Sequence, residues 1–114
     1  MTDLYKTNSH LPPVHDYIEN HFFEDLNLTF LAEMCGLVPE YFSRIYKKSY
    51  HMSPMEHVHK LRMQEAKKKL IFSSTPIATI AKSVGYNSPS HFGKLFRQQE
   101  AMSPNQFRAL YKHT

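Results

Sequence analysis

The chain has 114 residues, a formal net charge of +4 and a single cysteine, Cys35, which excludes an intrachain disulfide. A domain of this length can bury a core without covalent cross-links, and three glycines with few β-branched runs argue against a sheet protein. No apolar run approaches the roughly 18 residues of a membrane span, and MTDLYKTNSH lacks the segments of a signal peptide, so we expect a cytoplasmic protein with no membrane partner.

Three helices are predicted in the first part of the chain, after a flexible leader. Pro13 is expected to open the first helix, because proline is tolerated in a first turn. Asn27 is expected to cap the second helix and Gly36 to end it. Cys35 is predicted to be a core residue. The predicted ranges are 1–12 for the leader and 13–23, 28–35 and 39–50 for the helices, and the third helix is expected to bury Phe42, Ile45 and Tyr46.

A long linker helix is predicted from Pro54 to Phe72, capped by Ser53. At 1.5 Å per residue it spans roughly 28 Å. The basic run Lys67–Lys69 near its end is explained equally well by favourable charge at a helix C-terminus and by contact with a polyanion. Its apolar positions cover more than one stripe, as expected of a helix that packs against two units: Val58, Leu61, Met63, Ala66, Leu70 and Ile71.

Three more helices are predicted after the linker. Thr75-Pro76 opens the fifth, Ser88 caps the sixth, which covers about 88–99, and Pro104 opens the seventh. In the sixth helix Phe92, Leu95 and Phe96 fall on one inward face. In the last helix we expect Phe107, Leu110 and Tyr111 to pack against the core, and Arg108 and Lys112 to stay outside.

The same pattern occurs twice, over residues 28–54 and 77–104. The offset between matching residues is 49 before the turn and 50 after it, so the second copy has one extra turn residue. Each copy reads as a short helix, a glycine turn and a second helix with a polar, basic outer face, which is the pattern of a helix-turn-helix. An ordered set of matches indicates a duplicated unit. The matching positions include Gly36 with Gly85, Pro39 with Pro89, Phe42 with Phe92, and Met52-Ser53-Pro54 with Met102-Ser103-Pro104.

This duplicated pattern resembles the DNA-binding domain of AraC/XylS-family transcriptional regulators, most closely in the second copy with its IA…VGY…SPSHFGKLFR…MSP run. The resemblance covers about Asp16 to Tyr111. It implies an all-α fold of seven helices, with two helix-turn-helix subdomains joined by a long linker helix. The expected boundaries are a leader over 1–12, a first subdomain over 13–53, the linker helix over 54–72 and a second subdomain over 73–114.

The resemblance also implies a function and partners. We expect a bacterial transcriptional regulator that binds double-stranded DNA, with the helices at about 39–50 and 88–99 entering adjacent major grooves. RNA polymerase is a further candidate partner. A domain that senses an effector or dimerises often precedes such a unit, so we expect the chain to be a separate or excised C-terminal domain.

The charge distribution favours a polyanionic partner. Through Phe42 there are one basic and seven acidic residues, whereas from Ser43 onward there are thirteen basic and three acidic ones, giving −6 and +10. A solvated surface of mixed charge would explain any single lysine, but it explains this segregation poorly.

The outer faces of the third and sixth helices carry the predicted DNA contacts. Base readout needs donors and acceptors near a helix N-terminus, flanked by cations that hold phosphates. Arg44 can pair bidentately with guanine, and Glu40 can accept from cytosine. For Gly93 two interpretations stay open: it lets the helix backbone approach the DNA closely, or a glycine is simply tolerated at this outer position. The resemblance implies base contacts at Glu40, Ser43, Arg44, Ser90, Gly93 and Lys94, and the expected phosphate contacts are Lys47, Lys48, Ser88 and Arg97.

Eight histidines raise the alternative of a metal or catalytic site. His57 and His59 are two apart on a helix, so they point in different directions, whereas metal-binding pairs on helices sit four apart. The other histidines are scattered along the chain, and no paired carboxylates stand in a recognisable setting. We therefore predict no enzyme, no metal site and no cofactor. The remaining alternative to DNA binding is a protein-interaction module, in which the second helix-turn-helix no longer reads DNA.

Overall fold

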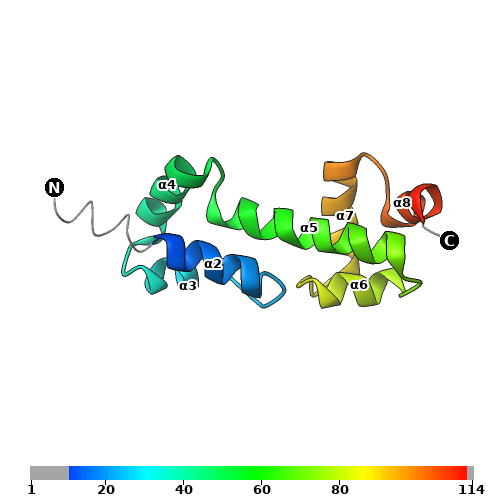
Figure 1. The fold of residues 1–114 in the computed structure, drawn as a ribbon, viewed down its shortest axis with the longest axis horizontal. Helices are drawn as coiled ribbons and strands as arrows, with labels where there is room; N and C mark the ends of the chain where they lie inside the picture. Colours follow the sequence, from blue (N-terminus) through cyan, green and yellow to red (C-terminus); the bar gives the residue numbers. More distant parts are fainter. Residues whose placement is uncertain (1–10, 113–114) are drawn as a thin grey trace. The chain divides into compact units, whose positions relative to one another are not determined.

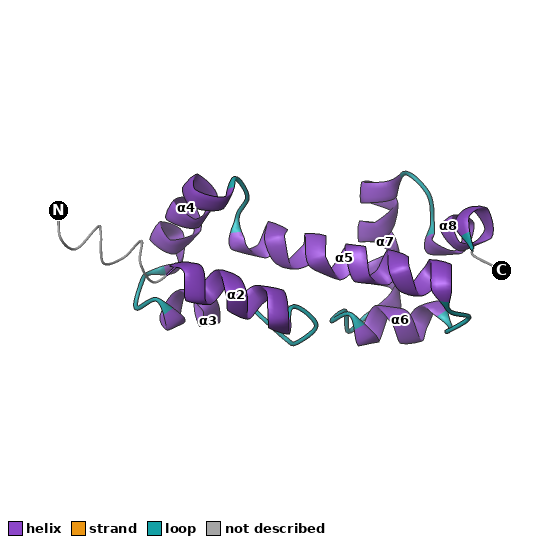
Figure 2. Ribbon diagram, viewed as in Figure 1, coloured by secondary structure: helices purple, strands orange, loops and turns teal. Residues whose placement is uncertain are grey.

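The computed structural model describes residues 11–112, which form seven α-helices and no strand (Figures 1 and 2). The predicted all-α fold is therefore confirmed for this part of the chain. None of these helices is long and apolar enough to span a membrane. The helices are α2 (Leu11–His21), α3 (Leu28–Met34), α4 (Pro39–Tyr50), α5 (Pro54–Phe72), α6 (Ile77–Ser83), α7 (Pro89–Glu100) and α8 (Pro104–Tyr111).

The start of α2 differs from the prediction. The helix begins at Leu11, two residues before Pro13, and it ends at His21, two residues before Phe23. Leu11 is only 1% exposed, so burial of its side chain in the core extends the helix towards the N-terminus. Pro12 and Pro13 still lie in the first turn, where a missing N–H leaves no hydrogen bond unmade. Most of the expected leader, residues 1–10, lies outside the described residues.

The described residues divide into two compact units between Leu61 and Arg62, within α5. Each unit has its own hydrophobic core, and α5 contributes to both. Val58 is fully buried in the core of the first unit. Met63, Ala66 and Leu70 are buried in the core of the second. The apolar residues of α5 therefore serve two cores, as their spread around the helix predicted.

The first unit is built from α2, α3, α4 and the beginning of α5 (Figure 1). Asn27 caps α3 as expected, since its Oδ1 accepts a hydrogen bond of 2.8 Å from the Phe30 N–H. Gly36 has a φ of +67° in the turn to α4, a conformation that favours glycine. The buried side chains of this unit are Leu11, Val14, Ile18, Leu26, Leu31, Ala32, Cys35, Phe42, Ile45, Tyr46 and Val58.

The second unit contains the rest of α5 with α6, α7 and α8. A chain of aromatic rings runs through its core. The ring centroids of Tyr86 and Phe92 lie 5.6 Å apart, those of Phe92 and Phe96 lie 5.7 Å apart, and those of Phe96 and Phe107 lie 5.4 Å apart. These spacings are typical of favourable aromatic pairs. Residues at helical spacing in α7 thus meet α8 and the turn before α7.

The Met-Ser-Pro sequence in each copy encodes the same helix start. Ser53 Oγ accepts from the Glu56 N–H at 3.2 Å, and Glu56 Oε1 accepts from the Ser53 N–H at 2.9 Å. Ser103 and Gln106 form the equivalent pair of bonds at the start of α8. Both are capping boxes, which satisfy helix N–H groups that otherwise have no partner. The hydrogen bonds from Ser53 hold the pKa of the Glu56 carboxyl below its usual value.

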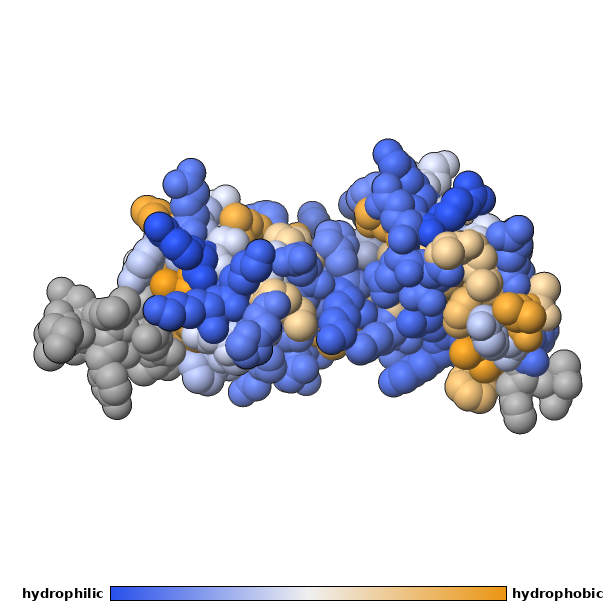
Figure 3. All heavy atoms as spheres, turned by 90° about the horizontal axis from the view of Figure 1, so that it is seen from above, coloured by the Kyte–Doolittle hydropathy of each residue, from blue (hydrophilic) through white to orange (hydrophobic). Residues whose placement is uncertain are grey.

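Two expectations for α8 are wrong. Leu110 is 63% exposed and Tyr111 is 50% exposed, so of the three predicted core residues only Phe107 is buried. Apolar atoms accordingly gather at the surface around α8 (Figure 3). Arg108, which was expected to stay outside, is instead partly buried. Its Nε donates to the Leu70 carbonyl at 3.1 Å and its Nη2 donates to the Ser73 carbonyl at 3.2 Å. This guanidinium satisfies carbonyl groups at and just after the end of α5, which is why Arg108 turns inward.

We expect Arg108→Ala to destabilise the second unit by about 1.5–3 kcal/mol, because hydrogen bonds from a charged donor contribute this much. Urea unfolding followed by circular dichroism measures the change. Lys112→Ala is the matched control, since the Lys112 ammonium donates to Ser74 Oγ at an exposed position. It should change the free energy of unfolding by less than about 0.5 kcal/mol. Equal losses for the two variants would contradict the proposed role of Arg108.

Candidate nucleic-acid interface

In the first unit, α3, the Gly36 turn and α4 form a helix-turn-helix, and the outer face of α4 carries the predicted contacts. Phe42, Ile45 and Tyr46 point into the core. On the opposite face Glu40, Arg44 and Lys47 are exposed and Ser43 is partly exposed. These four residues and Leu28 line one surface hollow, which we call the first hollow. Lys48 is exposed but does not line it.

Arg44 is well placed to reach a ligand. Its guanidinium carbon lies 5.7 Å from the centroid of the Tyr41 ring, an arrangement that supports the side chain through a cation–π interaction. It forms no ion pair with any residue between 11 and 112. Glu40 lies in the first turn of α4, where the helix dipole favours a negative charge. The outer face of α4 therefore presents the Arg44 guanidinium, which can donate several hydrogen bonds, beside the Glu40 carboxylate, which can accept them.

In the second unit, α6, a turn at Gly85 and α7 repeat this arrangement. Ser90, Lys94 and Arg97 are exposed on α7, whereas Phe92 and Phe96 are buried on its other side. Ser88 caps α7, because its Oγ accepts from the His91 N–H at 3.2 Å. Its hydroxyl hydrogen is still available to a phosphate. By the repeat, Ser90, Gly93, Lys94 and Arg97 of α7 occupy the places of Glu40, Ser43, Arg44 and Lys47 of α4.

Gly93 has open space beside it. A Cβ built at this position meets no atom within 4 Å outside its own helix backbone and its chain neighbours. The core of the second unit therefore does not require a glycine here. Both interpretations of Gly93, close approach of the α7 backbone to a ligand and simple tolerance of a glycine, agree with this open space.

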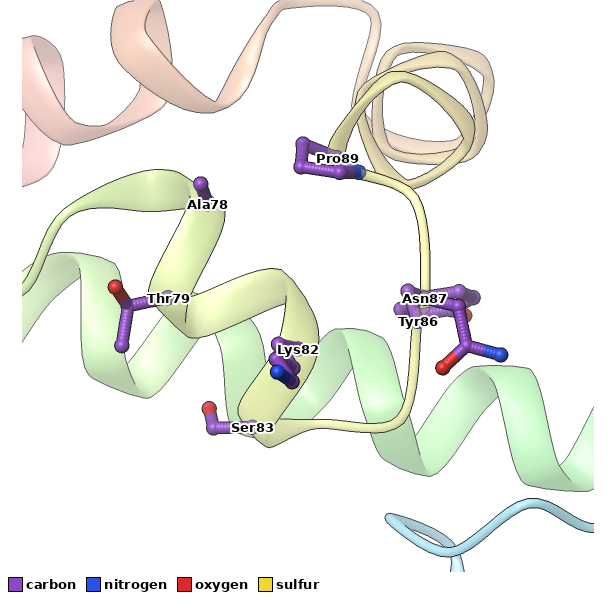
Figure 4. Close-up of a pocket in the computed structure, with 7 residues that line it drawn as sticks. All are labelled: Ala78, Thr79, Lys82, Ser83, Tyr86, Asn87 and Pro89. Atoms are coloured by element: carbon purple, nitrogen blue, oxygen red, sulfur yellow. The ribbon is translucent and has the colours of Figure 1, made fainter.

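A second surface hollow lies between α6 and the start of α7 (Figure 4), and sequence reasoning missed the polar residues that line it. Lys82 projects from the exposed side of α6, and Asn87 lies in the turn before α7, which is one residue longer than in the first copy. In the sequence, an isolated lysine such as Lys82 did not by itself indicate a binding residue. The hollow is lined by Ala78, Thr79, Lys82, Ser83, Tyr86, Asn87 and Pro89.

The three lysines near the end of α5, Lys67–Lys69, lie in different environments. Lys67 Nζ lies 3.2 Å from Glu100 Oε2, so Lys67 pairs with the last residue of α7 inside the second unit. Lys68 is exposed and Lys69 is partly exposed. Lys67 therefore has a structural role, and the alternative of contact with a polyanion is left to Lys68 and Lys69.

A family model described as a helix-turn-helix domain matches residues 31–110. The chain belongs to the AraC/XylS family of regulators, as their DNA-binding domain. It is 36% identical over 92 residues to the regulatory protein PocR of Salmonella typhimurium, and this match covers 81% of the chain and 30% of PocR. It is 33% identical over 97 residues to AdaA of Bacillus subtilis, which is named a bifunctional transcriptional activator and DNA repair enzyme.

A solved structure agrees with this family assignment. The C-terminal domain of AraT, a response regulator from Geobacillus stearothermophilus, matches with a TM-score of 0.85 and 33% identity, covering 90% of this chain and 86% of that one. The domain spans 30% of the length of PocR and 46% of AdaA, whereas it spans 86% of the AraT domain structure. The chain thus corresponds to the helix-turn-helix part of larger regulators.

Proposed function

We propose that this domain binds double-stranded DNA sequence-specifically as part of a bacterial transcriptional regulator, with α4 and α7 as its recognition helices. The observation that carries the proposal is the equivalence of two exposed helix faces. Each presents a cation at the place of Arg44 or Lys94, and each has another cation one turn further on. Helices with this pattern in a helix-turn-helix suit a major groove, which admits an α-helix and displays base edges.

Each residue has a distinct role in this proposal. Arg44 donates to O6 and N7 of a guanine, and Glu40 accepts from the amino group of a cytosine. Ser43, Ser90 and Lys94 complete the base contacts, and Gly93 allows close approach of α7. Phosphates are held by Lys47, Lys48, Ser88 and Arg97, and we add Lys82 to this set because it stands at the second hollow. None of these roles includes catalysis.

The two recognition helices are proposed to enter adjacent major grooves of one DNA duplex. The α5 helix runs without interruption from Pro54 to Phe72, which corresponds to a length of about 28 Å. Successive major grooves on one face of B-DNA repeat at about 34 Å. A continuous helix that belongs to both units suits this spacing, so that one chain covers two half-sites. RNA polymerase and an effector-binding or dimerising domain outside this chain remain proposed partners. The proposed location of this chain is the cytoplasm.

Selection of binding sites from a random DNA pool, followed by a salt titration on the selected duplex, tests the function. If about five cations neutralise phosphates, the logarithm of the affinity should fall with the logarithm of the salt concentration at a slope of about −4 to −5. A flat salt dependence, or no binding to any duplex, would contradict the proposal and favour the protein-interaction module.

Two substitutions on α4 separate base readout from phosphate contact. Arg44→Ala should weaken binding to the selected site by about 1–3 kcal/mol and relax the preference at one base pair. Lys48→Ala should weaken binding to selected and random duplexes alike, and lower the salt slope by about 1. Both residues are exposed, so both variants should fold normally. If Arg44→Ala weakened both duplexes equally, Arg44 would not read a base.

A further inference from the structure

In the first unit, three side chains of the types that bind metal ions lie close together. His15 and Glu19 come from α2 and His57 comes from α5. One ligand atom from each residue lies within 4.8 Å of the other two. His15 Nδ1 is 3.7 Å from Glu19 Oε1, and His57 Nε2 is 3.8 Å from Glu19 Oε2. We call these three residues the histidine cluster.

The spacing of the ligand atoms is close to that of a metal site. With metal–nitrogen bonds of about 2.0–2.1 Å, two ligands at a tetrahedral angle lie about 3.4 Å apart. The two distances to Glu19, which involve its two different carboxylate oxygens, exceed this value by a few tenths of an ångström, and the ligand atoms of all three residues lie within 4.8 Å of one another. His15 and Glu19 are four residues apart on one helix, the spacing that places two ligands on the same face. Binding an ion therefore requires the side chains to move together by up to about an ångström, which rotation of the half-exposed Glu19 carboxylate can supply.

Neighbouring groups orient both imidazole rings. The Tyr46 hydroxyl and His57 Nδ1 lie 2.7 Å apart, and this hydrogen bond is buried. When Nδ1–H donates to the hydroxyl oxygen, the lone pair of His57 Nε2 faces Glu19. The His15 ring stacks on the Tyr50 ring with centroids 4.3 Å apart. A metal-ligating histidine commonly has such a hydrogen bond at its other nitrogen, which fixes the tautomer and the ring orientation.

We propose that His15, Glu19 and His57 bind one divalent transition-metal ion of the zinc class in the first unit. Two imidazole nitrogens and one carboxylate oxygen suit Zn²⁺, Co²⁺, Ni²⁺ or Cu²⁺, whereas Mg²⁺ and Ca²⁺ prefer all-oxygen sites. The Glu19 side chain is 47% exposed, so an ion can enter from solvent and keep a water as a further ligand. The site links α2 to α5, and through Tyr46 and Tyr50 it contacts the inner side of α4.

Metal binding can be measured on the chain purified without a histidine tag. Equilibrium dialysis should show one Zn²⁺ per chain bound more tightly than any further ions, and Co²⁺ should develop a visible absorption that Zn²⁺ displaces. Zn²⁺ should raise the melting temperature, because a ligand that binds only the folded state stabilises it. Mg²⁺ at the same concentration should leave it unchanged. If the wild-type chain bound no Zn²⁺ ion more tightly than the others, the proposal would be overturned.

Variants identify the ligands. Glu19→Gln and His15→Gln should each weaken the tight ion at least about tenfold, and each should abolish most of the rise in melting temperature. The Glu19 side chain is 47% exposed and the His15 side chain 27% exposed, and circular dichroism verifies that both variants fold. His21→Gln is the matched control, because His21 Nδ1 lies 2.6 Å from Glu24 Oε2 in an exposed histidine–carboxylate pair outside the cluster. An equal loss in His21→Gln, or no loss in Glu19→Gln, would overturn the assignment.

The buried tyrosine provides a second test of the same site. Tyr46→Phe retains all three ligands and the shape of the ring, but it removes the hydroxyl that orients His57. It should lower the affinity for the metal roughly tenfold, which is the lower end of the range for residues that support a ligand. Unchanged affinity in this variant would contradict the orienting role of Tyr46. None of these measurements needs DNA, so their outcome is independent of whether the domain binds a duplex.

Discussion

Inserting five base pairs between the two half-sites should remove most of the sequence-specific affinity of the domain. Five base pairs rotate the second half-site by half a helical turn, so that its major groove faces away from α7 when α4 occupies the first. Only one recognition helix can then read bases. Because specific binding is typically about 10³–10⁷ times tighter than non-specific binding, losing one of two equal readers should cost at least about thirtyfold. Titration of the two duplexes at one salt concentration measures the ratio.

A ten-base-pair insertion tests the distance between the half-sites separately from their rotation. It returns the second half-site to the original face of the DNA but moves it about 34 Å further away. A continuous linker helix of about 28 Å cannot lengthen to follow it. We therefore expect both insertions to weaken binding. Full affinity for either duplex would show that one helix-turn-helix alone reads the DNA, or that two chains bind separately.

Gly85→Ala should cause the largest loss of stability among single substitutions in the turns. Gly85 has a φ of +112°, which non-glycine residues rarely adopt. A Cβ at this position would lie 2.7 Å from Arg62 Nε and 2.9 Å from Arg62 Cζ. Arg62 is only 6% exposed, and its guanidinium lies 5.1 Å from the centroid of the Tyr86 ring. The clash cannot be relieved without displacing a buried charged side chain from its aromatic partner.

We expect Gly85→Ala to lower the free energy of unfolding by about 2–4 kcal/mol, within the range of severe substitutions. Burial raises the pKa of the Tyr86 hydroxyl, and the Arg62 guanidinium partly offsets this rise. The Tyr86 titration therefore reports independently whether Arg62 has moved. If the guanidinium is displaced, the pKa of Tyr86 in the folded variant should rise further.

Gly36→Ala is the control for this effect, because the repeat places Gly36 at the position of Gly85. Its φ is +67°, and a Cβ there meets nothing within 4 Å. The backbone penalty alone should be about 1–2 kcal/mol. The difference between the two variants in urea unfolding measures the clash with Arg62 together with the less favourable φ of Gly85, which lies outside the left-handed helical region. Equal losses would show that backbone conformation accounts for both.

The duplication is visible in the sequence itself, and most helix boundaries could be predicted because local interactions determine them. Both predicted ends of α2 were wrong, since burial of Leu11 extends that helix towards the N-terminus. Asn27, Ser53 and Ser88 accept hydrogen bonds from N–H groups three residues later, so a cap depends only on its own helix. The predicted start and end of α4 agree with the structure, since proline opens it and the chain turns left-handed at His51 after it. The outward positions of Glu40, Arg44 and Lys94 likewise follow from helical periodicity alone.

Interactions between distant segments were decided only by the tertiary structure. Arg108 was expected in solvent, because nothing local indicates that carbonyl groups of Leu70 and Ser73 would lie beside it. The sequence likewise identified Gly85 as a turn residue but gave no indication of Arg62 against it. Residues far apart in the chain become neighbours through the packing of whole helices, which depends on many side chains at once.

The histidine cluster shows the same limit most clearly. The sequence offered His57 and His59, which cannot share an ion, and left His15 among scattered histidines. Packing of α2 against α5 instead brings His15 and Glu19 to His57, within 4.8 Å of one another. The sequence by itself determined the helices, the duplication and the faces that could meet DNA, since these follow from neighbours within one or two turns. Only the tertiary structure decided which side chains from different helices meet, because that depends on how the helices pack together.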